Sequence, residues 1–404
     1  MSFDPTALRR HFPALDGPDA AAHFDGPGGS QTPRQVAEAV AAALVSPLAN
    51  RGSVTSAERK AEAIVVAARQ AMADLLGSDP GGVIFGRSMT QLTMDTARTL
   101  SRGWRAGDEL IVTRLDHDAN VRPWVIAAER TGAVVRWADF DPASGELPVE
   151  AVTDLLSERT RVVAVTAASN LIGTMPDIPA ITAAARAAGA LSHVDAVHYS
   201  AHMAVDRKAL GADFLVCSPY KFCGPHCGVL TADPALLETL VPDKIVPSTD
   251  AVPERFELGT LPYELLAGVT AAVDFLAAMI PHREERPAGG SRRERLVAAM
   301  TAMAEHELGL RTRIEQALAE LGATVYSRAA RRTPTLLFTL PGTDPHTVYA
   351  RLAARGVNAP AGTFYAPECS RALGLGDAGG VRVGLAPYTD DADVTRLITA
   401  LSTV

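Results

Sequence analysis

The sequence predicts an α/β protein in which helices cover both faces of a mainly parallel sheet, followed by a smaller α/β domain. Short, almost continuously apolar segments alternate with amphipathic helical segments up to Leu230, which is typical of a parallel sheet buried on both faces. After Leu230 this alternation gives way to two long helical segments and a second group of short strands. Polar residues follow several apolar segments at their C-terminal ends, where open α/β sheets bind ligands.

In the first part of the chain, Pro33 starts a helix, and Thr55 or Ser56 caps a second helix that ends at Leu76. Strands are expected at 81–86, 108–115, 133–140, 161–169, 190–196 and 212–217, with helices between most of them. In the second part, helices are expected at the end of 255–280, up to Leu321, at 343–356 and at 390–404, and strands at 324–327, 333–340 and 379–385.

Residues 283–295 are charged and contain Gly and Pro, which predicts an exposed connection and a domain boundary near 281–291. We expect a large domain at 21–285 and a small domain formed by 1–20 and 286–404.

The composition excludes several classes of protein. A net charge of −8 on 404 residues argues against non-specific nucleic-acid binding. The N-terminus lacks the apolar core of a signal peptide, and no apolar run is long and uncharged enough to span a bilayer. The four cysteines are interpreted as small packing residues in a reducing cytosol rather than as metal ligands. We therefore expect a soluble cytoplasmic protein without a metal site or membrane partner.

The stretch from His193 to Leu230 carries the main chemical signal. Asp195 ends one apolar strand, and Lys221 lies in a turn just after the next. An amine at the C-terminal edge of such a sheet can form a Schiff base, and a carboxylate there can hold a proton on a ring nitrogen. This pair predicts pyridoxal phosphate as the cofactor. Lys221 follows an apolar run and precedes Gly-Pro, so a role as a solvated surface lysine does not explain it.

Other residues are assigned by what this cofactor would require. His117 would stack on the ring, Asn170 and His198 would reach its phenolic oxygen, and Arg382 would bind a substrate carboxylate. Ser88–Thr90 begin a helix, where free N–H groups favour phosphate, so Met89 and Thr90, with Ser218 and Tyr220, would hold the phosphate. The turn at 24–29 brings the backbone of Gly28 close to a ligand. Taken singly, most of these residues are better explained as helix caps, core histidines or a salt-bridging arginine, and Lys221 is the exception.

Several motifs together resemble one family. HVDAVH (193–198) and SPYKFCGPHCGVL (218–230) are similar to motifs of class V aminotransferase-fold enzymes, close to the cysteine desulfurase and selenocysteine lyase group. Further matching segments follow the family's order: 50–52, 115–124, 168–174, 256–260 and 381–389. The resemblance implies the fold type I architecture with a seven-stranded sheet, and a homodimer with shared active sites. It also implies that Thr260 and Arg51 serve the partner subunit's site, Thr260 at the cofactor and Arg51 at the substrate.

The sequence departs from this family at three positions. His198 replaces a glutamine, and Tyr220 replaces the histidine before the lysine. In the loop where desulfurases carry a nucleophilic cysteine, Tyr365 lies near that place and Cys369 follows four residues later. A persulfide requires a thiolate that reaches the substrate sulfur.

The departures favour β-elimination on cysteine or an S-substituted cysteine, that is, C–S lyase activity, with Lys221, His117 and Tyr365 as catalytic residues. Tyr365 is expected to gate the site, to protonate a leaving group or simply to pack. The alternatives are an aminotransferase or an isopenicillin N epimerase-like enzyme, a cysteine desulfurase or selenocysteine lyase, and a non-catalytic scaffold that binds pyridoxal phosphate.

Overall fold

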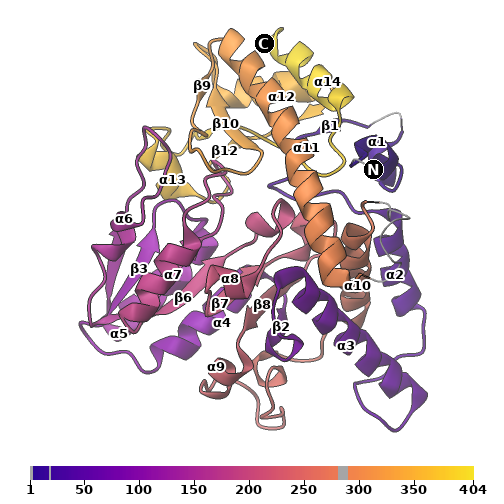
Figure 1. The fold of residues 1–404 in the computed structure, drawn as a ribbon, viewed down its shortest axis with the longest axis vertical. Coiled ribbons are helices and arrows are strands. Elements are labelled where there is room, and N and C mark those ends of the chain that lie inside the picture. Colours follow the sequence, from indigo (N-terminus) through magenta and orange to yellow (C-terminus); the bar gives the residue numbers. More distant parts are fainter. Residues whose placement is uncertain (1–2, 18–19, 281–289) are drawn as a thin grey trace.

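A seven-stranded sheet forms the centre of the computed structural model, which describes residues 3–17, 20–280 and 290–404 (Figure 1). Its order is β2-β8-β7-β6-β5-β3-β4. The parallel strands are β3 (Glu109–Thr113), β4 (Val134–Ala138), β5 (Thr160–Thr166), β6 (Leu191–Asp195) and β7 (Phe214–Cys217). The strand β8 (Gly228–Ala232) runs antiparallel to β7 and to β2 (Val83–Gly86), because the link from β7 to β8 is too short for a crossover. The predicted mainly parallel sheet is confirmed.

Helices cover both faces of this sheet, as the apolar strands predict. Leu110 and Val112 of β3 pack in one core with α4 (Met89–Ser101) and α5 (Arg122–Thr131). Ile111, which points to the opposite face, packs in another core with α3 (Ser56–Leu76), α7 (Ile178–Ala187) and α10 (Tyr263–Ala277). Thr55 caps α3 through a capping box with Glu58, as the sequence predicts. The remaining helices of this part are α2 (Arg34–Leu44), α6 (Glu150–Thr153), α8 (Arg207–Leu210) and α9 (Pro234–Glu238).

The C-terminal part contains a smaller antiparallel sheet in the order β12-β13-β10-β9 (Figure 1). Its strands are β9 (Thr324–Val325), β10 (Thr335–Thr339), β12 (Ala361–Gly362) and β13 (Gly380–Gly384), and its helices are α11 (Arg292–Glu320), α12 (Pro345–Ala353), α13 (Pro367–Ala372) and α14 (Asp391–Leu401). The start of the chain joins this part. Arg9 of α1 (Pro5–Arg9) pairs with Asp393 at 2.5 Å, and β1 (Ala22–His23) pairs with β11 (Val357–Asn358).

The predicted connection at 283–295 differs from the structure at its end. Residues 292–295 are helical, because Ser291 caps α11 in a capping box with Glu294. Residues 281–289 lie outside the described residues, so the domain division at 285 remains a prediction. No helix of the described ranges combines the length and the apolar character that crossing a bilayer requires.

A buried ion pair fixes the segment 256–260, which the sequence analysis singled out. The carboxylate of Glu257 accepts hydrogen bonds from both terminal nitrogens of Arg69 in α3, at 2.8 and 2.9 Å. The same carboxylate accepts the backbone N–H of Phe85 in β2 at 2.8 Å. The Glu257 carboxylate therefore joins this segment to α3 and to β2, an edge strand of the large sheet.

We expect Glu257→Gln to lower the free energy of unfolding by about 3 kcal/mol, because it leaves the Arg69 guanidinium without its main counter-charge in the interior. Urea denaturation followed by circular dichroism measures the change. Glu62→Gln is the matched control, since Glu62 pairs with Arg51 at the surface, where an ion pair contributes about 0–1 kcal/mol. Equal losses in the two variants would contradict a structural role for the buried pair.

Candidate active site

A cavity of about 590 Å³ lies at the carboxyl ends of the parallel strands, with the C-terminal part on its other side. It brings together most of the predicted site residues: Gly28, Met89, Thr90, His117, Asn170, Asp195, His198, Ser218, Tyr220, Lys221, Tyr365 and Arg382. Thr260 and Arg51 do not line it. Thr260 lies in a separate pocket beside His226, and Arg51 pairs with Glu62 and Glu254.

Lys221 reaches this cavity from the turn after β7. Its Nζ donates hydrogen bonds to the carbonyl oxygens of Pro27 and Gly28, the latter at 3.1 Å, and lies 4.6 Å from the centre of the Tyr220 ring. Burial, together with the positive charge of Arg382, lowers the pKa of Lys221 to about 7. Near neutral pH a large fraction of the amine is therefore uncharged, and can act as a nucleophile or as a base.

Asp195 presents a carboxylate at the end of β6. Its Oδ1 accepts the backbone N–H of Val197 at 2.9 Å. Burial raises the pKa of Asp195 to about 6, whereas the nearby Lys221 lowers it. A protonated ring nitrogen beside this carboxylate would stabilise its negative charge, as water does for an exposed carboxylate.

His117 is held as a neutral imidazole. Its Nδ1 accepts the backbone N–H of Ala119 at 3.0 Å, so the hydrogen of the neutral ring lies on Nε2. Burial lowers the pKa of His117 to about 4, and the charge of Lys221 acts in the same direction. A flat, uncharged ring of this kind is suited to stacking on an aromatic cofactor.

The N-terminus of α4 forms one end of the cavity. Ser88 caps this helix by accepting the N–H of Gln91 at 3.2 Å, and Met89 and Thr90 are its first two residues. Gly228 lets β8 lie directly against this turn, because a Cβ there would be 2.2 Å from the carbonyl carbon of Ser88. The first N–H groups of a helix have no partner within it and attract anions.

Arg382 of β13 lies on the opposite side of the cavity. Its guanidinium donates to the carboxylate of Asp25 at 2.6 Å and to the carbonyl oxygen of Asn170 at 3.1 Å. The Phe364 ring stacks against the guanidinium, with its centre 3.7 Å from Cζ. The predicted arginine therefore faces the cavity, but it already has an anionic partner.

The residues that follow Ala361–Gly362 form a fixed loop over the cavity. Phe364 and Tyr365 both have positive φ, 51° and 59°, which is uncommon for bulky side chains. Their carbonyl oxygens are anchored: that of Phe364 accepts the side-chain amide of Asn170 at 2.8 Å, and that of Tyr365 accepts the N–H of Asp118 at 2.7 Å. The Tyr365 side chain is 77% exposed, and its ring lies 5.5 Å from that of His117, centre to centre.

Two hydroxyl groups of the C-terminal part hold the His198 side chain in place. Its Nε2 lies 2.8 Å from the hydroxyl of Thr333 and 3.0 Å from that of Thr335. Its ring contacts that of His202, and His202 Nδ1 lies 2.9 Å from the carboxylate of the fully buried Glu307. Burial holds the pKa of His198 well below its usual range, so the ring is neutral. A glutamine at this position has no ring with which to make the contact to His202.

The cysteine thiols do not face this cavity. All four are buried and free, and none lines the cavity within the part of the chain that the structure describes. Cys369 lies in α13, where burial raises the pKa of its thiol far above the usual range. Cys369, four residues after Tyr365, therefore lies in a helix and not in the loop over the cavity.

The lining of the cavity fits pyridoxal phosphate. It combines an amine for the aldehyde, a carboxylate for the ring nitrogen and a helix N-terminus with the hydroxyls of Thr90 and Ser218 for the phosphate. Two buried polar atoms, Oδ1 of Asn170 and Nδ1 of His198, have no hydrogen-bond partner among the described residues. Buried polar atoms are normally paired, so both are suited to a polar ligand.

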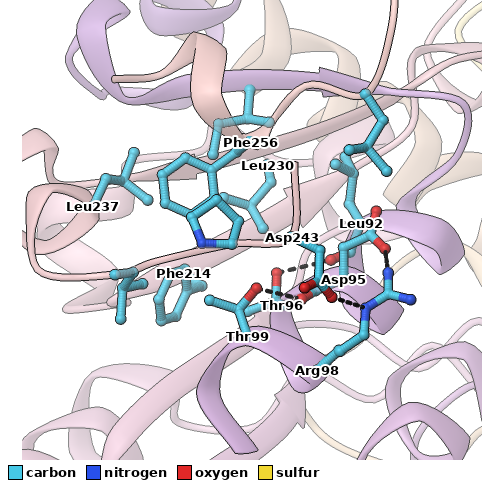
Figure 2. Close-up of a pocket in the computed structure, with 14 residues that line it drawn as sticks. Leu92, Asp95, Thr96, Arg98, Thr99, Phe214, Leu230, Leu237, Asp243 and Phe256 are labelled. Atoms are coloured by element: carbon cyan, nitrogen blue, oxygen red, sulfur yellow. Dashed lines mark hydrogen bonds and ion pairs between the residues drawn. The ribbon is translucent and has the colours of Figure 1, made fainter. Parts of the chain in front are cut away.

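Among the lining residues that sequence reasoning missed are the two that contact the Arg382 guanidinium, Asp25 and Phe364. Asp25 lies inside the turn at 24–29 that the sequence singled out, but only its contact with Arg382 reveals its role. Figure 2 shows a second, smaller pocket, in which Phe214, Leu230 and Leu237 form an apolar wall beside an ion pair between Arg98 and Asp243. No predicted site residue lines it.

Comparisons with known proteins agree with the geometry. The profile of the family described as Aminotransferase class-V matches residues 22–287 and 295–397. The chain is 34% identical to "Uncharacterized protein MT3887" of Mycobacterium tuberculosis, over the full length of both. It is 32% identical to "Aminotransferase-like protein FGM3" of Gibberella zeae, over 100% of this chain and 99% of the relative. The crystal structure of the cysteine desulfurase CsdA from Escherichia coli superposes with a TM-score of 0.86 at 26% identity, over 100% of this chain and 98% of that one.

The lowered pKa of Lys221 predicts how the cofactor-free protein captures pyridoxal phosphate. The neutral amine is the reactive form, so the capture rate should rise with pH up to about 7 and then level off. Stopped-flow absorbance between pH 5.5 and 10 measures this rate, and Lys221→Ala should give no covalent capture. A rate that keeps rising towards about pH 10.4, the pKa of a solvent-exposed lysine, would contradict the buried environment.

Proposed function

Because the chain belongs to the Aminotransferase class-V family, whose members depend on pyridoxal phosphate, we propose that it is a C–S lyase acting on cysteine or an S-substituted cysteine. The observation that carries the proposal is the cavity lining, which offers Lys221 and Arg382 but no thiol among the described residues. In the overall reaction, the substrate and one water give a thiol, pyruvate and ammonia. No external oxidant or reductant is needed.

In this proposal the residues of the chain orient the substrate and move its α-proton. Arg382 binds the carboxylate, and the backbone at Gly28 borders it. Lys221, with its pKa near 7, accepts the proton from Cα. Bound pyridoxal phosphate supplies an electron sink that delocalises the charge left at Cα. Asp195 stabilises the ring-nitrogen proton that this sink requires.

Tyr365 is the residue we assign to the leaving sulfur. As the Cβ–S bond breaks, the sulfur departs with the electron pair and needs a proton. The exposed phenol of Tyr365 at the mouth of the cavity is positioned to provide it or to admit water. His117, whose ring lies next to that of Tyr365, is assigned to stacking on the face of the cofactor ring.

An aminotransferase is the second candidate. The observation in its favour is the name of one full-length relative, "Aminotransferase-like protein FGM3". The same Lys221 can return the proton to the cofactor instead of expelling sulfur, in which case the amino group is transferred to a 2-oxo acid. The further alternatives are epimerase, desulfurase and selenocysteine lyase activities, and a scaffold without turnover.

We also propose that the protein acts in the cytoplasm as a homodimer with shared sites. Thr260 and Arg51 lie outside the cavity of their own chain, and exposed apolar side chains stand near both, namely Leu258 and Val54. A second subunit that covers these side chains would bring Thr260 to the cofactor phosphate and Arg51 to the substrate.

The holoenzyme should release pyruvate and a thiol from an S-substituted cysteine, and Lys221→Ala should reduce this rate by about 10²–10⁴-fold. Pyruvate is measured with lactate dehydrogenase and the thiol with a chromogenic disulfide. Amino transfer to an added 2-oxo acid, without thiol release, would replace the lyase proposal by the aminotransferase.

Cys369→Ala should leave the rate of pyruvate formation from cysteine unchanged, because the thiol is buried in α13. Cys227→Ala, which removes another buried thiol, controls for packing effects. Alanine production together with a persulfide on Cys369, both lost in Cys369→Ala alone, would establish a desulfurase instead.

A further inference from the structure

The carboxylate subsite contains an anion supplied by the protein itself. Asp25 Oδ1 accepts from Arg382 Nη2 at 2.6 Å. Arg382 is almost completely buried, with a side-chain exposure of 2%, whereas that of Asp25 is 27%. The arginine therefore cannot turn to solvent, but the aspartate can.

The geometry of the turn makes the position of Asp25 specific. Its carboxylate packs directly on the Cα of Gly28, where an added Cβ would lie 2.2 Å from Oδ2. A larger residue at 28 would therefore push the carboxylate away from Arg382. The glycine assigned to substrate binding is also required for the ion pair.

Arg382 keeps capacity for another ligand. Its remaining contacts are the Asn170 carbonyl oxygen and the face of Phe364, and its Nε–H is buried without a partner among the described residues. An unpartnered, buried N–H of a guanidinium is suited to a carboxylate that binds through two oxygens.

Two carboxylates on the one guanidinium would leave an excess negative charge beside a buried side chain. The charge of Asp25 balances that of Arg382, so a second carboxylate would meet repulsion that the low local dielectric strengthens. One anion must therefore leave, and Asp25 is the one with access to water.

We propose that Asp25 is the resident counter-ion of the carboxylate subsite, which a ligand must displace from Arg382, and that this competition selects ligands with a free carboxylate. The inference rests on the proposed function, in which Arg382 binds the substrate carboxylate. A ligand that contacts two N–H groups prevails over the single contact of Asp25. A neutral amide or ester cannot replace the lost ion pair, and is rejected.

The test measures binding of propionate to the holoenzyme by titration calorimetry, which does not depend on turnover. Asp25→Asn keeps the shape and an acceptor oxygen but removes the competing charge, so propionate should bind about tenfold more tightly. The neutral analogue propionamide should bind as it does to the unmodified enzyme. Asp25→Ser gives a second neutral variant should Asn fail to fold.

The matched control is Asp118→Asn. Asp118 lines the same cavity with a similar side-chain exposure of 31%, but it pairs with Arg122 rather than with Arg382. This variant, and Asp25→Glu, which keeps the charge, should not show the tenfold gain. Arg382→Met should lose propionate binding, which locates the site.

Unchanged or weaker propionate binding in Asp25→Asn would show that Asp25 only orients the arginine, and would overturn the proposal. Equal tightening in Asp118→Asn, or no propionate binding to any form of the enzyme, would overturn it as well. Absence of lyase activity together with tighter propionate binding in Asp25→Asn would refute the proposed function alone, so the two failures are distinguishable.

Discussion

The buried guanidinium of Arg382 is the contact on which the arrangement of the cavity depends. It joins the N-terminal turn through Asp25, the loop after β5 through Asn170, and the small sheet through its own strand and Phe364. The turn that supplies Asp25 also supplies the two carbonyl oxygens that hold Lys221. Because Arg382 also lowers the pKa of Lys221, the same charge orders the cavity and sets the protonation state of its amine.

The fold and half of the site could be predicted because their signals are local. Apolar strands, caps such as Thr55 and the residues after strand ends, such as Asp195 and Lys221, lie within a few positions of the pattern that identifies them. Asp25 and Arg382 are 357 positions apart, and no local pattern links them. The antiparallel strand β8 and the short helix α13 were likewise missed, because brief segments carry too little periodicity.

His198, which stands where the resembled family has a glutamine, is the first residue in a chain of buried contacts. The imidazole is shared between two hydroxyls of the C-terminal part and the ring of His202, which in turn meets Glu307 of α11. The buried carboxylate of Glu307 is compatible with the interior only because His202 accompanies it. A residue on the cavity wall is thus connected through one ring to the long helix α11, which contributes side chains to both of the main hydrophobic cores. The sequence marked His198 as a departure, but not the chain of contacts behind it.

The loop over the cavity presents aromatic side chains and no cysteine thiol. A reactive cysteine requires exposure and a lowered pKa, and Cys369 has neither, because α13 begins at Pro367 and carries it into the core. Phe364 and Tyr365, just before the N-cap residue of this helix, are held in left-handed conformations by hydrogen bonds from Asn170 and Asp118. Such strain persists only where surrounding contacts fix it, and it is typical of functional loops. The segment in which the family resemblance places a desulfurase nucleophile here holds two aromatic rings, one on Arg382 and one beside His117, and the proposed lyase function rests on this difference.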